Sequence, residues 1–187
     1  MKSNLLRGAA AAILLGVSLA ASAQFSGPYA PANWMTNHLP DATFDSGSAD
    51  FSGAPASVTL VGSDNGFGAP SEFRLTAVAA TGGTFSFNWA YESFDSDSPL
   101  QDPAGAFRNG NVQLSSNGGA TNQSGSFSLA VNQGDVIGFW VGTTDNLFGG
   151  ATLTISNFSA PIPEPGAAAL LALGLAGLAV WRSRRAS

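Results

Sequence analysis

Hydrophobic and polar residues alternate along the middle of the chain, from about residue 57 to residue 158. The clearest run covers residues 84–91 and places four aromatic side chains on one face: Phe85, Phe87, Trp89 and Tyr91. The opposite face carries Thr84, Ser86, Asn88 and Ala90. A period of two residues is typical of a strand with one buried face, so this run predicts a half-buried strand.

Six other runs predict further strands, at residues 57–61, 72–79, 111–115, 126–131, 136–141 and 151–158. The segment 136–141 is almost continuously apolar, which is typical of a strand covered on both faces. Turn-forming Gly and Asn residues separate the runs, and the lead-in before residue 57 predicts short strands only around 42–44 and 50–51. Many short strands without an amphipathic helix predict an all-β fold, an antiparallel β-sandwich or barrel.

The first 23 residues have the pattern of a secretory signal peptide. Lys2 and Arg7 form a basic start, an apolar run follows, and Ala21-Ser22-Ala23 provides small residues for cleavage. We expect a signal peptide helix that signal peptidase removes after Ala23, using Ala21 and Ala23 as the recognised small residues. The alternative is a buried N-terminal helix of the fold.

The last 27 residues differ from the strand-rich middle. Pro161 to Pro165 contains three prolines, which cannot donate backbone hydrogen bonds, so we expect the sheet to end there. Residues 166–181 are apolar and predict a transmembrane helix about 24 Å long, slightly short of a membrane core of about 30 Å. The basic tail 182–187 predicts a cytoplasmic end.

This tripartite tail resembles the PEP-CTERM sorting signal. The matching residues are Pro163, Glu164 and Pro165, the apolar segment, and the basic residues Arg182, Arg184 and Arg185. The resemblance implies that exosortase cleaves near Pro163–Pro165 and passes the protein from an inner-membrane intermediate to the cell surface or the extracellular space. It also implies an exopolysaccharide or biofilm context. The alternative is an ordinary single-span C-terminal anchor.

The middle, residues 24–160, is expected to be one ectodomain. The stretches 85–107 and 134–158 are similar to a jelly-roll-like ectodomain that recurs in PEP-CTERM proteins, which implies a β-sandwich of that type and transfers no activity. Arg74 and Arg108 oppose eleven acidic residues there, a net charge of −9. Without lysine, this domain cannot neutralise nucleic-acid phosphates, which excludes nucleic acid as a partner.

The chain has no cysteine, which excludes disulfides, thiol nucleophiles and thiolate zinc sites. Closely spaced acidic residues nevertheless provide the oxygen ligands that calcium prefers. Asp95, Asp97 and Asp102 follow the aromatic run, and Asp145 with Asn146 lies in another loop that would have to share an edge with them. These residues predict a calcium site; the alternative is a solvated acidic loop.

Four aromatic residues are candidates for stacking on sugar rings: Trp34, Trp89, Tyr91 and Trp140. All but Trp34 lie in predicted strands, where a core position is the default, so Trp34 is the candidate ligand-binding residue. No serine lies in a G-x-S-x-G nucleophile motif, and His38, the single histidine, lies in the irregular lead-in. One sequence cannot show whether Glu72, Glu92 and the aspartates form a glycosidase pair. We therefore expect no catalytic residue and no enzymatic activity.

These patterns together predict an exported structural or adhesive protein of the surface matrix. Its expected partners are the secretion machinery with signal peptidase, exosortase, the membrane and exopolysaccharide. The first alternative is a carbohydrate-binding module stabilised by calcium. The second is a secreted hydrolase that uses His38 or Asp97.

Overall fold

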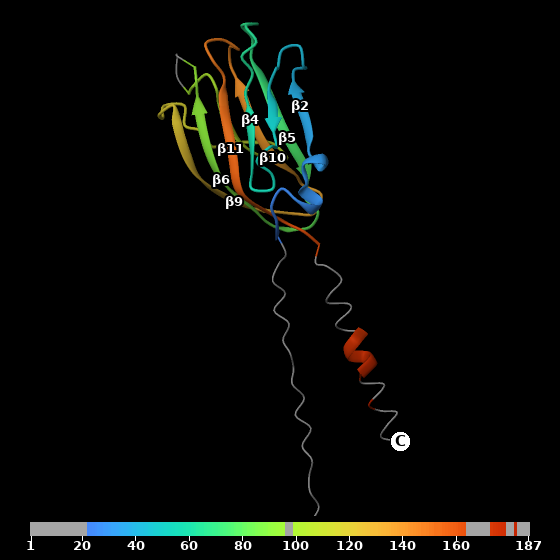
Figure 1. Ribbon diagram of the computed structural model, residues 1–187. Helices are drawn as coiled ribbons and strands as arrows, with labels where there is room; N and C mark the ends of the chain where they lie inside the picture. Colours follow the sequence, from blue (N-terminus) through green and yellow to red (C-terminus); the bar gives the residue numbers. More distant parts are fainter. Residues whose placement is uncertain (1–21, 96–98, 164–172, 179–181, 183–187) are drawn as a thin grey trace, which may run out of the picture.

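The computed structural model describes residues 22–95, 99–163, 173–178 and 182. Two antiparallel sheets face each other and enclose one core (Figure 1). From edge to edge, the first sheet contains β3 (Ser48–Asp50), β4 (Ser57–Val61), β11 (Ala151–Pro161), β6 (Gly83–Ser93) and β9 (Asn122–Val131). The short strand β1 (Ser22–Ala23) also pairs with β11. The second sheet contains, in order, β2 (Met35–Leu39), β5 (Ser71–Val78), β10 (Val136–Thr143), β7 (Ala104–Arg108) and β8 (Asn111–Gln113). The predicted antiparallel β-sandwich is confirmed.

The alternating runs place their apolar side chains in the space between the sheets. On β6, Phe85, Phe87 and Tyr91 are buried, and on β11 Leu153 and Ile155 face the same core. Because aromatic rings dominate this core, its packing depends on ring contacts as well as on buried area. The strand predicted to be covered on both faces is β10, where Ile137, Phe139 and Val141 enter the core while Trp140 lies on the outer side of the sheet.

The irregular lead-in packs beneath the sandwich and closes its core. It contains two short 3₁₀ helices, η1 (Gly27–Tyr29) and η2 (Pro31–Asn33), which are followed by the core residue Trp34. The Tyr29 hydroxyl donates to the backbone oxygen of Pro161 at 2.9 Å and accepts the backbone N–H of Ala80 at 3.1 Å. These bonds tie the start of the domain to its last strand.

The structure departs from the expected elements at three places. Residues 42–44 form a turn rather than a strand, because the Asp41 side chain accepts the backbone N–H of Thr43 at 2.7 Å. Strands β2 and β7 were not expected, since neither shows the hydrophobic alternation that marks a half-buried strand. The sheet also continues as far as Pro161, which is the last residue of β11 and pairs with Ser22 at its edge.

Several predicted segments lie outside the described residues. They are the signal peptide up to residue 21 with Ala21, most of the apolar segment 166–181, and the motif residues Glu164, Pro165, Arg184 and Arg185. Residues 173–178 are helical and exposed. In the described part of the chain, we find no helix with the length and apolar character needed to cross a membrane.

Candidate functional site

The outer face of the second sheet holds a tryptophan at its centre. Trp140 on β10 pairs with Arg74 on β5 and with Gly105 on β7. Gly138 and Gly142 lie two residues away on the same face of β10. A Cβ atom added at Gly105 would lie 2.9 Å from the indole Nε1, so the missing side chain leaves the indole its space. The indole N–H donates to the backbone oxygen of Ala106 at 2.9 Å, which fixes the ring.

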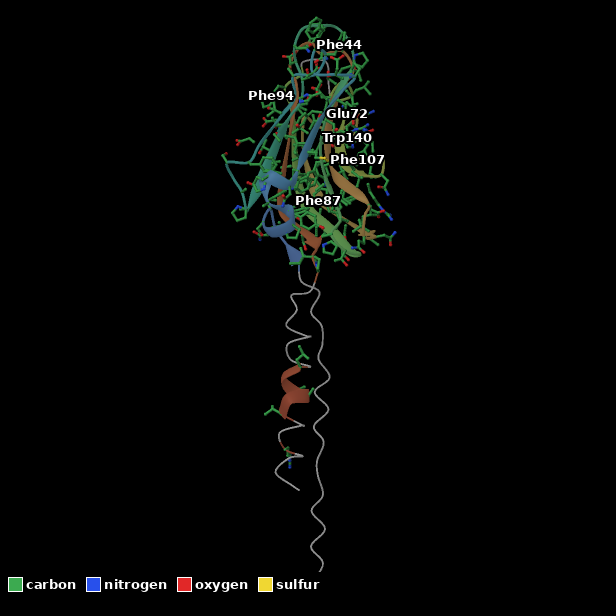
Figure 2. All side chains as sticks on the ribbon, turned by 90° about the vertical axis from the view of Figure 1, so that its right-hand side faces the viewer. Phe44, Glu72, Phe87, Phe94, Phe107 and Trp140 are labelled. Atoms are coloured by element: carbon green, nitrogen blue, oxygen red, sulfur yellow. The ribbon has the colours of Figure 1, made fainter. Side chains whose placement is uncertain are left out.

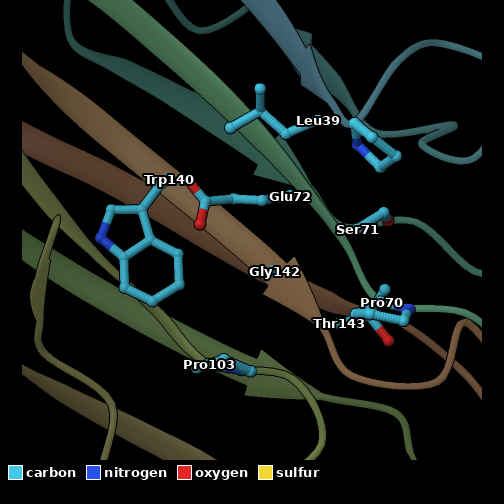
Figure 3. A pocket seen from close by; sticks show the side chains of 9 residues that line it. Leu39, Pro70, Ser71, Glu72, Pro103, Trp140, Gly142 and Thr143 are labelled. Atoms are coloured by element: carbon cyan, nitrogen blue, oxygen red, sulfur yellow. The ribbon is translucent and has the colours of Figure 1, made fainter.

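An open pocket of about 430 Å³ adjoins this ring (Figure 3). Its walls are mainly apolar: Leu39, Pro40, Pro70, Pro103 and Trp140. Its polar groups come from Ser71, Glu72 and Thr143. A mainly apolar pocket with a few polar groups is the usual form of a small-ligand site.

Arg74 on the same strand and Asn111 on β8 hold the Glu72 carboxylate in place beside the pocket. Arg74 pairs with it through Nε, and the Asn111 side-chain amide donates to Oε2 at 2.7 Å. The Arg74 guanidinium also lies 5.0 Å from the centre of the Phe107 ring. Glu72, Trp140 and Phe107 lie together along one side of the sandwich (Figure 2). A carboxylate held in this way can accept ligand hydroxyl groups without first being ordered.

A carboxylate cluster lies next to the pocket, where the loops after β6 and β10 meet. Asp102 is fully buried, and its carboxylate accepts the Ser93 hydroxyl at 3.1 Å. Burial raises the pKa of Asp102 to about 7; the hydroxyl groups of Ser93 and Thr143 oppose this rise, whereas the negative charges of Asp95 and Asp145 add to it. The Tyr91 hydroxyl donates to the Asp102 backbone oxygen at 2.7 Å.

Asn146 connects this cluster to the other loops at the same end. Its side-chain Nδ2 donates to the backbone oxygens of Phe44 and Ala69, at 2.9 and 2.7 Å, and to Ser71 Oγ at 3.1 Å. Its backbone N–H donates to the Thr143 hydroxyl at 3.0 Å. Its φ of 57° is left-handed, a conformation that Asn tolerates better than most residues. One buried amide therefore holds several loop segments together.

The predicted calcium ligands are partly brought together. The charges of Asp95 and Asp145 both act on Asp102, so the two loops do share an edge, whereas Asp97 lies outside the described residues. Within the described ranges, no three acidic, histidine or cysteine side chains converge closely enough to hold a metal ion together. Amide, hydroxyl or backbone oxygens would have to complete the ligand set.

The other sequence candidates occupy different environments. Trp34 is 8% exposed, and its ring stacks on Phe139 at 5.5 Å, so its faces are largely occupied by the core. His38 Nδ1 lies 2.8 Å from Oδ2 of the buried Asp45. Glu92 is exposed on β6, in the other sheet from Glu72. Trp140 was one of the four candidates for sugar stacking, and the residue is 5% exposed where it lines the pocket. The presence of Glu72 in the same pocket was not expected.

Comparison with known proteins identifies the tail. Residues 161–185 match the PEP-CTERM protein-sorting motif, which confirms the resemblance. The motif marks an exported protein that an exosortase sorts to the cell surface. The chain is thus a sorted surface protein with a β-sandwich ectodomain. No curated protein sequence matches it.

Solved structures give distant matches. A family 35 carbohydrate-binding module from Clostridium thermocellum matches with 13% identity and a TM-score of 0.34, over 72% of this chain and 95% of that one. The family 11 module of the cellulase Lic26A-Cel5E of the same organism matches with 7% identity and a TM-score of 0.37, over 78% and 97%. The mannanase GH26-CBM35 of Podospora anserina matches with 16% identity and a TM-score of 0.33, over 71% and 29%. At these scores the matches carry no inference about ligand or activity.

Proposed function

We propose that this protein is an adhesive component of the cell-surface matrix whose ectodomain, residues 24–160, binds a neutral glycan in the pocket beside Trp140. The observation that carries the proposal is the combination of an aromatic ring with the held Glu72 carboxylate in one open pocket. Sugars present both apolar C–H faces and hydroxyl groups, so a site for them needs both kinds of partner.

The groups in the pocket suit this chemistry. The indole edge of Trp140 and the proline walls provide apolar contact. Glu72 can accept hydroxyl hydrogens, and the hydroxyl groups of Ser71 and Thr143 can donate as well as accept. The volume of about 430 Å³ lies within the range of small-ligand sites, so we expect one or two sugar units of a longer chain to be bound.

The charge of the domain narrows the class of glycan. Two arginines and eleven acidic residues leave a net charge of −9 on residues 24–160. A field of this sign repels carboxylated or sulfated polysaccharides. Moreover, Arg74, the arginine nearest the pocket, is already paired with Glu72. An uncharged exopolysaccharide is therefore the preferred ligand.

We also propose that binding occurs without turnover. Glycosidases generally place two carboxyl groups about 5–9.5 Å apart across the scissile bond. Glu72 is the one carboxylate among the described residues that line the pocket. This favours a binding site over a hydrolase.

We further propose that two proteases cleave the chain in a fixed order. Signal peptidase would cleave after Ala23, and residues 166–181 would hold an inner-membrane intermediate until exosortase acts near Pro163–Pro165. The pocket is lined by residues at the start of β5 and the ends of β2 and β10, whereas β1 and the last residues of β11, where the domain joins these two segments, lie at the other end of the sandwich. Attachment through the tail would leave the pocket accessible.

A glycan array tests the binding proposal with matched variants. We expect the protein to be retained on a subset of neutral glycans, and Glu72→Gln to weaken that binding by about 10–100-fold, because a hydrogen bond to a charged group contributes about 1.5–3 kcal/mol. Glu92→Gln is the control, since it makes the same change at an exposed site on the other sheet. Equal retention of the wild type and Glu72→Gln, with both melting at the same temperature, would contradict the proposal.

A purely structural role is the second candidate, and it rests on exposed aromatic residues at the loop end. Phe67, Phe94 and Phe148 are each more than half exposed, at 58%, 58% and 61%. Figure 2 shows Phe94 at the end of the sandwich that also carries Phe44. Exposed apolar groups at one end favour protein–protein contact. This role predicts self-association without retention on any glycan.

A further inference from the structure

The buried carboxylate of Asp102 has no positively charged side chain to balance it. Residues 24–160 contain no lysine, and their two arginines pair elsewhere, Arg74 with Glu72 and Arg108 with Asp135. Asp102 Oδ1 is buried and makes no hydrogen bond to any residue that the structure describes. A buried anion of this kind is costly unless a counter-charge accompanies it.

The groups around Asp102 add further oxygen atoms. Asp95 and Asp145 are close enough for their charges to act on it, and Ser93 links the first of them, since its hydroxyl accepts the Asp95 backbone N–H and donates to Asp102. Like charges brought together by two loops, the β6–β7 loop with Asp95 and Asp102 and the β10–β11 loop with Asp145, repel one another. A cation bound beside Asp102 would offset this repulsion.

Asn146 provides an independent indication of a ligand. Its amide oxygen is buried and has no hydrogen-bond donor among the described residues, although Nδ2 of the same amide makes three hydrogen bonds. Two of those bonds go to backbone oxygens, which accept only, so the amide cannot be turned over and Oδ1 faces the other way. Its backbone N–H bonds to Thr143, the hydroxyl that also acts on Asp102.

We propose that this loop end binds a calcium ion, held by the buried carboxylate of Asp102 and the buried amide oxygen of Asn146, with the charges of Asp95 and Asp145 nearby. Every donor is a hard oxygen atom, which suits calcium and not zinc or copper. Calcium takes six to eight oxygen ligands in flexible geometry, so backbone oxygens and water would complete the shell. Magnesium demands a stricter octahedral shell and is expected to bind more weakly.

The ion would also steady one side of the glycan pocket. Thr143 lines the pocket and accepts the Asn146 N–H, and Ser71 lines it and accepts the Asn146 side chain. Pro103, on the opposite wall, directly follows Asp102. Calcium binding would not depend on glycan binding, because the buried oxygens of Asp102 and Asn146 that have no hydrogen-bond partner are there without a glycan.

Thermal unfolding of the full-length protein tests the proposal. Calcium chloride at millimolar concentration is expected to raise the melting temperature by roughly 5 °C or more over the value in EGTA, since a ligand of the folded state stabilises it. Asp102→Asn is expected to lose that rise. Asp64→Asn, the same change at an exposed loop position, is expected to keep it. A wild type that melts at the same temperature in calcium and in EGTA would overturn the proposal, as would an unchanged calcium response in Asp102→Asn.

Terbium luminescence provides a readout on the wild type in case the variant does not fold. Terbium(III) occupies calcium sites and emits when a nearby excited aromatic residue transfers energy to it. Tyr91, which hydrogen bonds to Asp102, is placed to do so. We expect emission that excess calcium removes and that excess magnesium leaves largely intact. Absence of sensitised emission, or emission that calcium does not displace, would refute the site.

Discussion

Replacing Phe139 with alanine is expected to lower the free energy of unfolding by about 3–5 kcal/mol. The ring is fully buried on β10, at the centre of the aromatic core. It stacks on Trp34 at 5.5 Å and meets Phe87 edge-on at 5.0 Å. The substitution removes these contacts and leaves a cavity that the two sheets, each held rigid by its own hydrogen bonds, can close only partly.

Urea denaturation of the two proteins measures this loss directly. Phe148→Ala is the control, because the same side chain is removed from a position that is 61% exposed, and we expect a change within about 0.5 kcal/mol. A loss at Phe139 no larger than the loss at Phe148 would show that the aromatic rings do not form the stabilising core.

Replacing Asn146 with alanine is expected to cost about 3 kcal/mol or more. Three hydrogen bonds from Nδ2 are lost, and the backbone oxygens of Phe44 and Ala69 each lose a donor. Alanine must also adopt the left-handed φ of 57°, which costs about 1–2 kcal/mol. The loop end should therefore loosen as well as lose stability, and hydrogen exchange at the backbone N–H of Gly66, which donates to the Asn146 backbone oxygen, should become faster.

Asn157→Ala separates the cost of the left-handed backbone conformation from the cost of the lost side-chain hydrogen bonds. Asn157 also has a positive φ, 48°, but its side chain is exposed on β11. We expect only the backbone cost there, about 1–2 kcal/mol by chemical denaturation. Similar losses for the two variants would mean that the Asn146 hydrogen bonds contribute nothing beyond conformation.

Much of the fold could be predicted because hydrophobic alternation reports burial on one face. The run 84–91 lies within β6, and the apolar run 136–141 within β10. The two strands that were not predicted, β2 and β7, do not show this alternation. In β7 the sequence Ala-Gly-Ala-Phe-Arg is dominated by small residues, and β2 is a largely polar edge strand held by its pairing with β5. β2 pairs with β5 and β7 pairs with β10, both about 30 or more residues away, and local patterns do not report such pairing.

The candidate sites were predictable in part. Acid spacing indicated Asp95, Asp102 and Asp145, and the structure brings their loops together. The pocket could not be found in this way, since Trp140, Glu72 and Asn111 meet only through strand register and a bond between side chains 39 residues apart. Nor does the sequence show that Asn146 joins the loop end through hydrogen bonds to partners 75 to 102 residues away.

Mass spectrometry of the intact protein recovered from the cell surface is the most direct test of the central claim, that the chain is an exported protein whose working part is the sandwich domain. The claim predicts a mature N-terminus at Gln24 and a C-terminus near Pro163–Pro165, where the sorting motif begins. Recovery of surface protein that still ends in the intact tail 182–187 would contradict it.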